Sequence, residues 1–256
     1  DQIYLNSSAI SVAVRLLAMG HDVHMIDLNI DRLDTLQIRT LILRADIIGI
    51  SLSGAPHIPG VIELTKALRA IAPPCKIMLG GQVIERLSTD QFQRIFGDAA
   101  TQISNTTDLA KLLGCTPTDI PTQDTVAYSP IWKQMEEKRL VKYLRHEMTL
   151  VISQGCHFRC KFCAASKKMA EQFRPIDHFR ADLEYLVDVA KRHNITTLDF
   201  YASSLDFFQN PNKLRQYLET LAEVQEASGI KMRVRCLSCM TSFLEARRQM
   251  KDFDIL

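Results

Sequence analysis

The chain has 256 residues, of which 46% are hydrophobic and 23% are charged, with 31 basic residues against 29 acidic ones. This composition is typical of a folded globular protein of one large or two ordinary domains. The near-neutral balance gives no indication of a nucleic-acid surface, and no apolar run approaches the length of a membrane span. Seven cysteines without a recognisable export signal favour a protein of the reducing cytoplasm.

Residues 1–114 alternate short apolar runs with amphipathic segments. Strands are expected at residues 3–5, 23–26, 47–51, 76–79 and 99–103. Helices are expected at residues 11–19, 31–44, 59–70, 90–96 and 107–113, with Asp31 as an N-cap. Five βα units predict an α/β fold, an open five-stranded doubly wound sheet of Rossmann or flavodoxin type. Ligands of such sheets bind at the carboxyl ends of the strands.

Small residues follow two of these strands. Ser51 ends the run at 47–51, and Ser53 lies two residues beyond it. Gly80 and Gly81 directly follow the run at 76–79, and 26 residues separate Ser53 from Gly80. Small side chains at strand ends let the backbone approach a large flat ligand. The alternative is that Gly80 and Gly81 form only a tight strand-to-helix turn.

Residues 115–145 are predicted to be a linker. Pro117, Pro121 and Pro130 lie among Thr, Asp and Gln, and the stretch that follows mixes charges with few apolar anchors. The single tryptophan, Trp132, is expected to pack this segment against one of the domains.

From residue 146 the pattern is a strand, a cysteine-rich loop and then α/β repeats. Strands are expected at residues 149–153, 196–201, 231–236 and 254–256, and helices at 177–193, 211–228 and 242–250. This order predicts a (β/α) barrel. Residues 146–256 number only 111, less than half of a barrel of about 250 residues, so we expect only its N-terminal part here.

The cysteine-rich loop holds Cys156, Cys160 and Cys163 at the spacing C-x3-C-x2-C. Three thiolates on one tight loop suit an iron–sulfur cluster, because its iron prefers soft anionic sulfur ligands. His157 directly follows Cys156 and is badly placed to complete a zinc site with the same thiols. Three protein ligands would leave one iron of a 4Fe–4S cluster open. The alternatives are a small zinc knot or three unrelated thiols.

This loop resembles the signature of the radical S-adenosylmethionine (AdoMet) enzymes, C-x3-C-x-aromatic-C after the first barrel strand. Phe162 stands at the aromatic position, and Ser203 and Ser204 stand where the family often has a double acid near the AdoMet. The resemblance implies a 4Fe–4S cluster whose open iron chelates AdoMet and cleaves it to a 5′-deoxyadenosyl radical. An electron donor such as flavodoxin or ferredoxin would reduce the cluster.

Residues 1–114 resemble the cobalamin-binding domain that precedes the barrel in one branch of that family. Gly20-His21-Asp22-Val23 is similar to its recurrent G-H-x-V, and the interval from Ser53 to Gly80 fits its spacing. The resemblance implies that Ser51, Ser53, Gly80 and Gly81 bind cobalamin.

The D-x-H-x-x-G motif that supplies a cobalt-ligating histidine is missing, since residues 6–11 contain no histidine. We therefore expect the cobalt to have no histidine ligand below it. His24 is expected to lie within a strand, where it packs or is solvated. His57 either approaches the ligand or belongs to a surface loop.

Strand alternation predicts which side chains face the barrel lumen. Leu198 and Phe200 should pack under helices, which leaves Asp199 and Tyr201 facing inward. On the next strand Met232, Val234 and Cys236 should pack, which leaves Arg233 and Arg235 inward. These four lumenal residues could bind a substrate with a negative group, because guanidinium grips carboxylate or phosphate at two points. The alternative is a structural Asp199–Arg233 pair.

Cys236 and Cys239 form a C-x2-C at the end of the strand at 231–236. They could ligate an auxiliary cluster, act as a redox pair or hold nothing. Two ligands do not close a metal site by themselves, which favours incidental thiols.

The function that these patterns predict is a cobalamin-dependent radical AdoMet methyltransferase acting on an unactivated carbon. Its substrate would be a small molecule or peptide. A second interpretation keeps both cofactors but uses the radical for a rearrangement, a ring closure or a ring contraction. A third is a non-catalytic, cluster-bearing binding or sensing module.

Overall fold

The computed structural model describes residues 5–32, 35–72, 74–122, 126–158, 160–161, 163 and 169–251. The chain forms two compact units. One spans Met19–Pro121, and the other combines the segment up to Ala18 with the chain from Thr122 onward. Helix α1 (Ser7–Ala18) therefore groups with the C-terminal half of the chain and packs against a helix of that half. Within the described residues, no helix is long and apolar enough to cross a bilayer.

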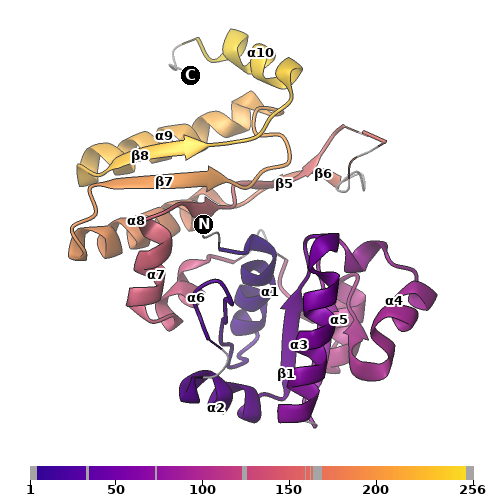
Figure 1. Cartoon of the computed structure of the whole chain (residues 1–256). Coiled ribbons are helices and arrows are strands. Elements are labelled where there is room, and N and C mark those ends of the chain that lie inside the picture. The colour runs from indigo at the N-terminus through magenta and orange to yellow at the C-terminus, as the bar shows by residue number, and fades with distance from the viewer. Residues whose placement is uncertain are drawn as a thin grey trace. The chain divides into compact units, whose positions relative to one another are not determined.

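The Met19–Pro121 unit is built on a parallel sheet of order β1-β2-β3. Its strands are β1 (Ile47–Ser51), β2 (Lys76–Gly80) and β3 (Thr101–Gln102). Its helices are α2 (Leu36–Arg44), α3 (Ile58–Ile71), α4 (Thr89–Phe96) and α5 (Thr106–Leu113), with short 3-10 turns η1 (Ala55–His57), η2 (Ile84–Arg86), η3 (Gly97–Ala99) and η4 (Pro117–Asp119). The core lies between sheet and helices, where Ile77 and Leu79 are almost fully buried. Figure 1 shows α3 running alongside β1.

The sheet of this unit is smaller than predicted, because the described residues contain three of the five expected strands. Residues 23–26 form no strand, and Ile26 instead packs on the core as a partly buried side chain. An apolar run indicates that a segment is buried, but it does not indicate whether a neighbouring strand is available to pair with that segment. The first expected strand lies mostly outside the described residues, since only Leu5 is described, and it belongs to no strand.

The start of α2 also differs from the prediction. Asp31 accepts a hydrogen bond from the Asp27 amide at 2.7 Å and so closes a preceding turn. Thr35 is the N-cap instead, and its hydroxyl accepts from the Ile38 amide at 3.4 Å. Both residue types cap helices, so the sequence alone did not separate them.

The segment predicted to be a linker, residues 115–145, contains two packed helices. These are α6 (Ser129–Gln134) and α7 (Glu137–Leu144). Trp132 is 1% exposed, which confirms the expectation that it packs, and α6 is the helix that contacts α1.

The second unit holds a parallel sheet of order β4-β7-β8. Its strands are β4 (Met148–Leu150), β7 (Thr197–Ala202) and β8 (Lys231–Arg235), and its helices after α7 are α8 (Ile176–Arg192), α9 (Pro211–Ser228) and α10 (Met240–Gln249). Figure 1 shows α8 and α9 lying together along one face of this sheet. The α/β repeats are as predicted, but the described residues form no closed barrel, and the strand expected at 254–256 lies outside them.

The single strand predicted at 149–153 is divided. Its first part belongs to β4, and Ser153 begins β5 (Ser153–Cys156), which pairs antiparallel with β6 (Met169–Phe173). The division occurs because the Leu150 carbonyl bonds to the Ser203 amide at 2.7 Å, whereas the Ile152 carbonyl bonds to the Arg174 amide at 3.1 Å. The cysteine loop therefore joins the two strands of a hairpin.

Candidate functional site

The first candidate site lies at the carboxyl ends of β1 and β2. Ser51 and Gly80 are register partners, so the ends of the two strands lie side by side. Ser53 is exposed, and Gly81 is partly exposed. The structure therefore brings Ser51, Ser53, Gly80 and Gly81 together at the edge where doubly wound sheets bind ligands.

Gly80 and Gly81 differ in whether the local backbone requires a glycine. Gly81 has φ +102°, and a Cβ there would lie 2.7 Å from the Leu52 carbonyl oxygen. Its identity therefore follows from the tight turn alone. At Gly80 an added Cβ would meet only the Ile103 carbonyl oxygen at 3.5 Å, an ordinary contact. The turn accounts for Gly81 and not for Gly80. The absence of a side chain at Gly80 would allow a large flat group such as cobalamin to approach the backbone.

Neither of the two questioned histidines reaches into the core of this unit. His24 lies half exposed with its Nε2 3.2 Å from an Asp22 carboxylate oxygen, which confirms that it is solvated. His57 is exposed in the turn before α3, where its amide donates to the Gly54 carbonyl at 3.1 Å. His57 therefore lies in a surface turn that follows β1.

The second candidate site is the cysteine loop between β5 and β6. Cys156 is the last residue of β5, and Gly155 before it has φ +91° at an irregularity in the strand pairing. Only glycine adopts such a conformation easily, so Gly155 permits the bulge between Gln154 and Cys156, after which Cys156 pairs with Met169. The Cys163 amide donates to the Cys160 carbonyl at 3.0 Å, which closes a turn between the other two cysteines.

The three thiols are partly buried and none is in a disulfide. Burial raises the pKa of Cys156, the negative charges of Asp206, Cys160 and Cys163 raise it further, and the Phe158 amide opposes this. Cys160 and Cys163 thus lie within electrostatic range of Cys156. In the part of the chain that the structure describes, no three His, Cys, Asp or Glu side chains converge closely enough to hold a metal ion. The donor chemistry of three thiols on one loop fits a cluster.

Polar residues from β6 and the loop after β7 surround the root of the cysteine loop. The Ser153 hydroxyl donates to a Glu171 carboxylate oxygen at 2.7 Å, and its oxygen lies within hydrogen-bond distance of the Ser204 hydroxyl at 3.1 Å. Burial raises the pKa of the Glu171 carboxyl, against hydrogen bonds from Ser153 and Gln209 that lower it. These contacts fix the first residue of the hairpin to the sheet.

The predicted AdoMet contacts are placed unequally. Ser204 is 8% exposed, and its hydroxyl is hydrogen-bonded to the hydroxyl of Ser153. The Ser204 side chain therefore supports the hairpin. Ser203 is partly exposed, with its amide bound to β4. Phe162 lies outside the described residues.

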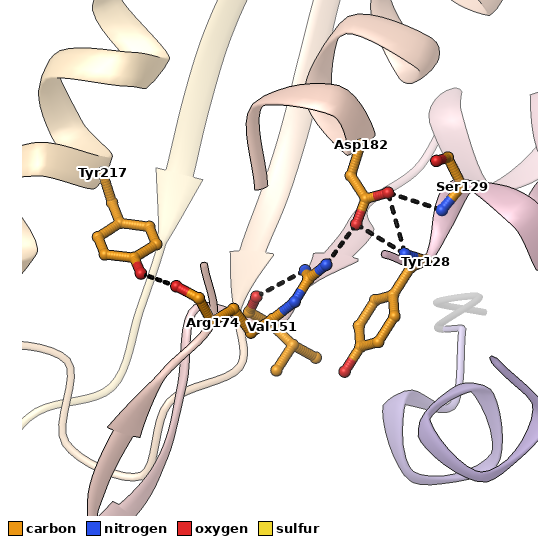
Figure 2. A network of polar contacts seen from close by, with 6 residues as sticks. All are labelled: Tyr128, Ser129, Val151, Arg174, Asp182 and Tyr217. Carbon is orange, nitrogen blue, oxygen red and sulfur yellow. Dashed lines mark hydrogen bonds and ion pairs between the residues drawn. The ribbon is translucent and has the colours of Figure 1, made fainter. Parts of the chain in front are cut away.

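A buried ionic network anchors the other end of the hairpin (Figure 2). Arg174 directly follows β6, and its guanidinium donates to Asp182 at 2.6 Å and to the Val151 carbonyl at 3.1 Å. Asp182 is fully buried and also accepts the Tyr128 and Ser129 amides at the start of α6. A hydroxyl from α9 completes the network, that of Tyr217, which donates to the Arg174 carbonyl. One carboxylate thus joins α6, α8 and the base of the cysteine hairpin.

The predicted lumenal residues share one face of the sheet, and they are paired. Leu198 and Phe200 are fully buried, as predicted, whereas Asp199 and Tyr201 are partly exposed on the opposite face. Arg233 donates to both Asp199 oxygens at 2.5 and 2.6 Å. This is the structural pair of the alternative interpretation.

Arg235 makes a similar two-point contact. It donates to both oxygens of Glu147 at 2.9 and 2.6 Å and lies 4.6 Å from the centroid of the Tyr201 ring. The expectation that Val234 packs under a helix is wrong, since Val234 is 36% exposed. The reason is that β8 is the last strand of the described sheet, and α10 does not cover it.

Cys236 and Cys239 have different surroundings at the end of β8. Burial and the Asp206 charge raise the pKa of Cys236. Cys239 is the N-cap of α10, and hydrogen bonds from Ser242 and Thr241 lower its pKa. The cap gives Cys239 a structural role.

Sequence reasoning missed Gln209, Asp206, Glu171, Arg174 and Asp182. One signal was available for Asp182. It stands three residues after Phe179 and one before Leu183, on the apolar face of a predicted helix, where a lone acid requires a buried partner. No spacing pattern marks the other four, because their partners lie on different elements.

One comparison with known proteins returned a family. Residues 5–105 match the model of the B12-binding domain. The chain therefore carries a B12-binding domain, and through that domain it is a cobalamin-binding protein. No radical AdoMet domain was detected. No curated protein matches the chain.

Proposed function

We propose that this cobalamin-binding chain is a radical AdoMet enzyme, most simply a methyltransferase acting on an unactivated carbon. Cys156, Cys160 and Cys163 would ligate a 4Fe–4S cluster whose open iron binds AdoMet. Ser51, Ser53, Gly80 and Gly81 would line the cobalamin site. Such a cluster supplies one electron for cleavage of AdoMet, and cobalamin supplies a carrier for its methyl group.

The observation that carries the proposal is the cysteine hairpin. Three thiols free of disulfides stand on one loop, at the carboxyl end of β4, on a chain that also carries a B12-binding domain. Active sites of parallel α/β folds lie at this end of their strands. The Arg174–Asp182 network and the Ser153–Ser204 contact hold the two ends of the hairpin in place.

The cluster is tested by anaerobic reconstitution with iron and sulfide. Wild type should bind about four irons per chain with the absorbance of a 4Fe–4S centre. Cys156→Ala, Cys160→Ala and Cys163→Ala should each lose it, whereas Cys115→Ala, a partly exposed thiol of the other unit, should retain it. Equal cluster content in all of these variants would contradict the proposal.

The type of reaction is separated by the fate of the methyl group. With methyl-labelled AdoMet and a reductant such as flavodoxin, methyl transfer places label in the product and yields S-adenosylhomocysteine and 5′-deoxyadenosine. An unlabelled product with 5′-deoxyadenosine would identify a rearrangement. A loaded protein that releases neither nucleoside would be the binding or sensing module. The paired state of Arg233 and Arg235 suggests that an anionic substrate would have to displace Asp199 or Glu147.

A further inference from the structure

Gln209 contacts the backbone on both sides of Cys156. It lies in the loop between β7 and α9, and its Nε2 donates to the Gly155 carbonyl at 3.0 Å. Its Oε1 accepts the His157 amide at 3.2 Å and lies 2.9 Å from the His157 Nδ1. One side-chain amide therefore holds the residue before the first cysteine and the residue after it.

The hydrogen bonds define the orientation of this amide. Only the NH₂ end can donate to the Gly155 carbonyl, so the oxygen end faces His157. An amide oxygen has no proton to give, so the His157 Nδ1 must carry one. Both ends of the Gln209 side-chain amide then have matching partners, which is a requirement for a side chain that fixes a loop.

Gln209 is itself held by a rigid support. Asp206, three residues earlier, is 2% exposed and accepts the Cys239 amide at 3.1 Å and the Ser242 hydroxyl at 2.6 Å. The backbone N–H of Gln209 donates to the Asp206 backbone carbonyl at 3.3 Å. The loop after β7 is thus fixed to the start of α10, and Gln209 extends from that fixed loop to the cysteines.

Cys156 needs such support because of the glycine beside it. Gly155, at φ +91°, is of the residue type with the greatest backbone freedom. Without the Gln209 contacts, the backbone at Gly155 would allow the Cys156 thiol a wider range of positions. Ligands held in place by a hydrogen-bonded outer shell bind metals more tightly, because less ordering remains to be done on binding.

We propose that Gln209 is a positioning residue for Cys156, which prepares the loop for its iron–sulfur cluster. The inference rests on the proposed function, since it concerns how the cluster site is held. Gln209 touches neither iron nor AdoMet in this role, and acts through the backbone of Gly155 and His157.

The variants that test this are Gln209→Ala and Gln209→Glu, with Gln216→Ala as the matched control. Gln216 is an exposed glutamine on α9, seven residues further along the chain. Gln209→Glu keeps an oxygen for His157 but replaces the donor to the Gly155 carbonyl with a second oxygen. It also preserves the size of the side chain, and it replaces the Gln209 hydrogen bond to Glu171 with a second carboxylate. Because it keeps the acceptor for the His157 amide, it remains informative if the alanine variant fails to fold.

Two readouts are needed, neither of which is enzyme activity. In the cluster-free protein, backbone hydrogen exchange at His157 should become faster in Gln209→Ala and stay near wild type in Gln209→Glu and Gln216→Ala. After reconstitution, both Gln209 variants should lose iron to a chelator about tenfold to a hundredfold faster than wild type. Gln216→Ala should match wild type in this assay.

The possible results separate the two proposals. If wild type binds iron and both Gln209 variants release it at the wild-type rate, the positioning role is wrong and the proposed function stands. If wild type binds no iron, the proposed function is wrong and the positioning role falls with it.

Discussion

The two units of the chain bury different kinds of side chain. In the Met19–Pro121 unit, Thr65 is the one buried polar side chain among the described residues, and its hydroxyl bonds within its own helix to the Val61 carbonyl at 2.7 Å. The other unit buries polar groups that bond between elements, and they concentrate around the cysteine hairpin. They include Ser153, Arg174, Asp182, Ser204, Asp206 and Ser242.

This difference indicates two ways of making a site. At the ends of β1 and β2 the candidate site has room because a side chain is missing at Gly80, whose glycine the turn does not require. At the end of β4 it is made by fixing a loop through hydrogen bonds, as at Asp182 and Gln209. Substitutions that add atoms should therefore damage the first site, and substitutions that remove atoms should damage the second.

The largest effect is expected for Asp182→Ala. It leaves the Arg174 guanidinium and the Tyr128 and Ser129 amides without their buried acceptor. Breaking a buried pair in this way costs about 3–5 kcal/mol of unfolding free energy. Urea unfolding followed by Trp132 fluorescence measures it, because the single tryptophan is buried in α6, which Asp182 caps.

The matched control is Asp188→Ala, an exposed acid on the same helix as Asp182. It should change the unfolding free energy by less than about 0.5 kcal/mol. Similar losses in both variants would show that the helix, and not the buried network, is sensitive to the change.

A smaller loss of stability is expected for Gly81→Ala. Alanine would be strained at φ +102°, and its Cβ would collide with the Leu52 carbonyl. Strain of this kind costs about 1–3 kcal/mol. Urea unfolding followed by circular dichroism should show it as a lower urea midpoint. A variant as stable as wild type would mean that the turn after β2 is looser than the structure shows.

Gly80→Ala should separate folding from cofactor binding. Its Cβ has room within the protein, so the unfolding free energy should change little. If cobalamin lies against Gly80, the added methyl should weaken binding by about tenfold, or ~1.4 kcal/mol. A cobalamin titration followed by visible absorbance measures this, with Gly60→Ala in α3 as the control because a Cβ there meets nothing within 4 Å. Unchanged affinity would exclude Gly80 from the site.

The smallest effect is expected at an exposed contact in the second unit. Hydrogen bonds from Arg192 and His193 lower the pKa of Glu137 from 4.5 to about 2. A lowered pKa contributes stability above the ordinary pKa, and that contribution is lost as the pH falls from 4.5 toward 2. Wild type should therefore be slightly more stable than Glu137→Gln at pH 6, and the difference should vanish near pH 2.

The urea midpoint measured across that pH range provides the test, with Glu184→Gln, an exposed acid of α8, as the control. The effect should be small because Glu137 is 40% exposed and salt screens such pairs. A difference that grows as the pH falls would have the wrong sign for this account.

Much of the fold could be predicted from local pattern. The bounds of β1, α9 and β8 follow from apolar runs, a proline near a helix start and glycine at a helix end, which act within a few residues. Residues 23–26 could not be placed, because their apolar pattern does not show whether a partner strand exists. Prolines led to α6 being missed, although Pro130 stands in the first turn of that helix, where proline is favourable. The mixed charges of residues 137–144 led to α7 being missed.

The candidate site was predictable only where its chemistry lies in sequence spacing. Sequence spacing alone identifies Cys156, Cys160 and Cys163 as candidates. It also identifies the serines and glycines at the ends of β1 and β2. Gln209 contacts residues more than fifty positions away, so no interval marks it. Arg233 and Asp199 were placed on the correct face, but whether they pair or remain open depends on distances that only the structure gives.

The most direct test of the central claim is a joint measurement of iron, sulfide and cobalamin in one anaerobically reconstituted sample. The account predicts about four irons, four sulfides and one cobalamin per chain in wild type. Cys156→Ala should lose the iron and keep the cobalamin, whereas Gly80→Ala should keep the iron and bind cobalamin about tenfold more weakly. A wild-type protein that binds cobalamin without iron, or a Cys156→Ala variant that retains its iron, would contradict the account.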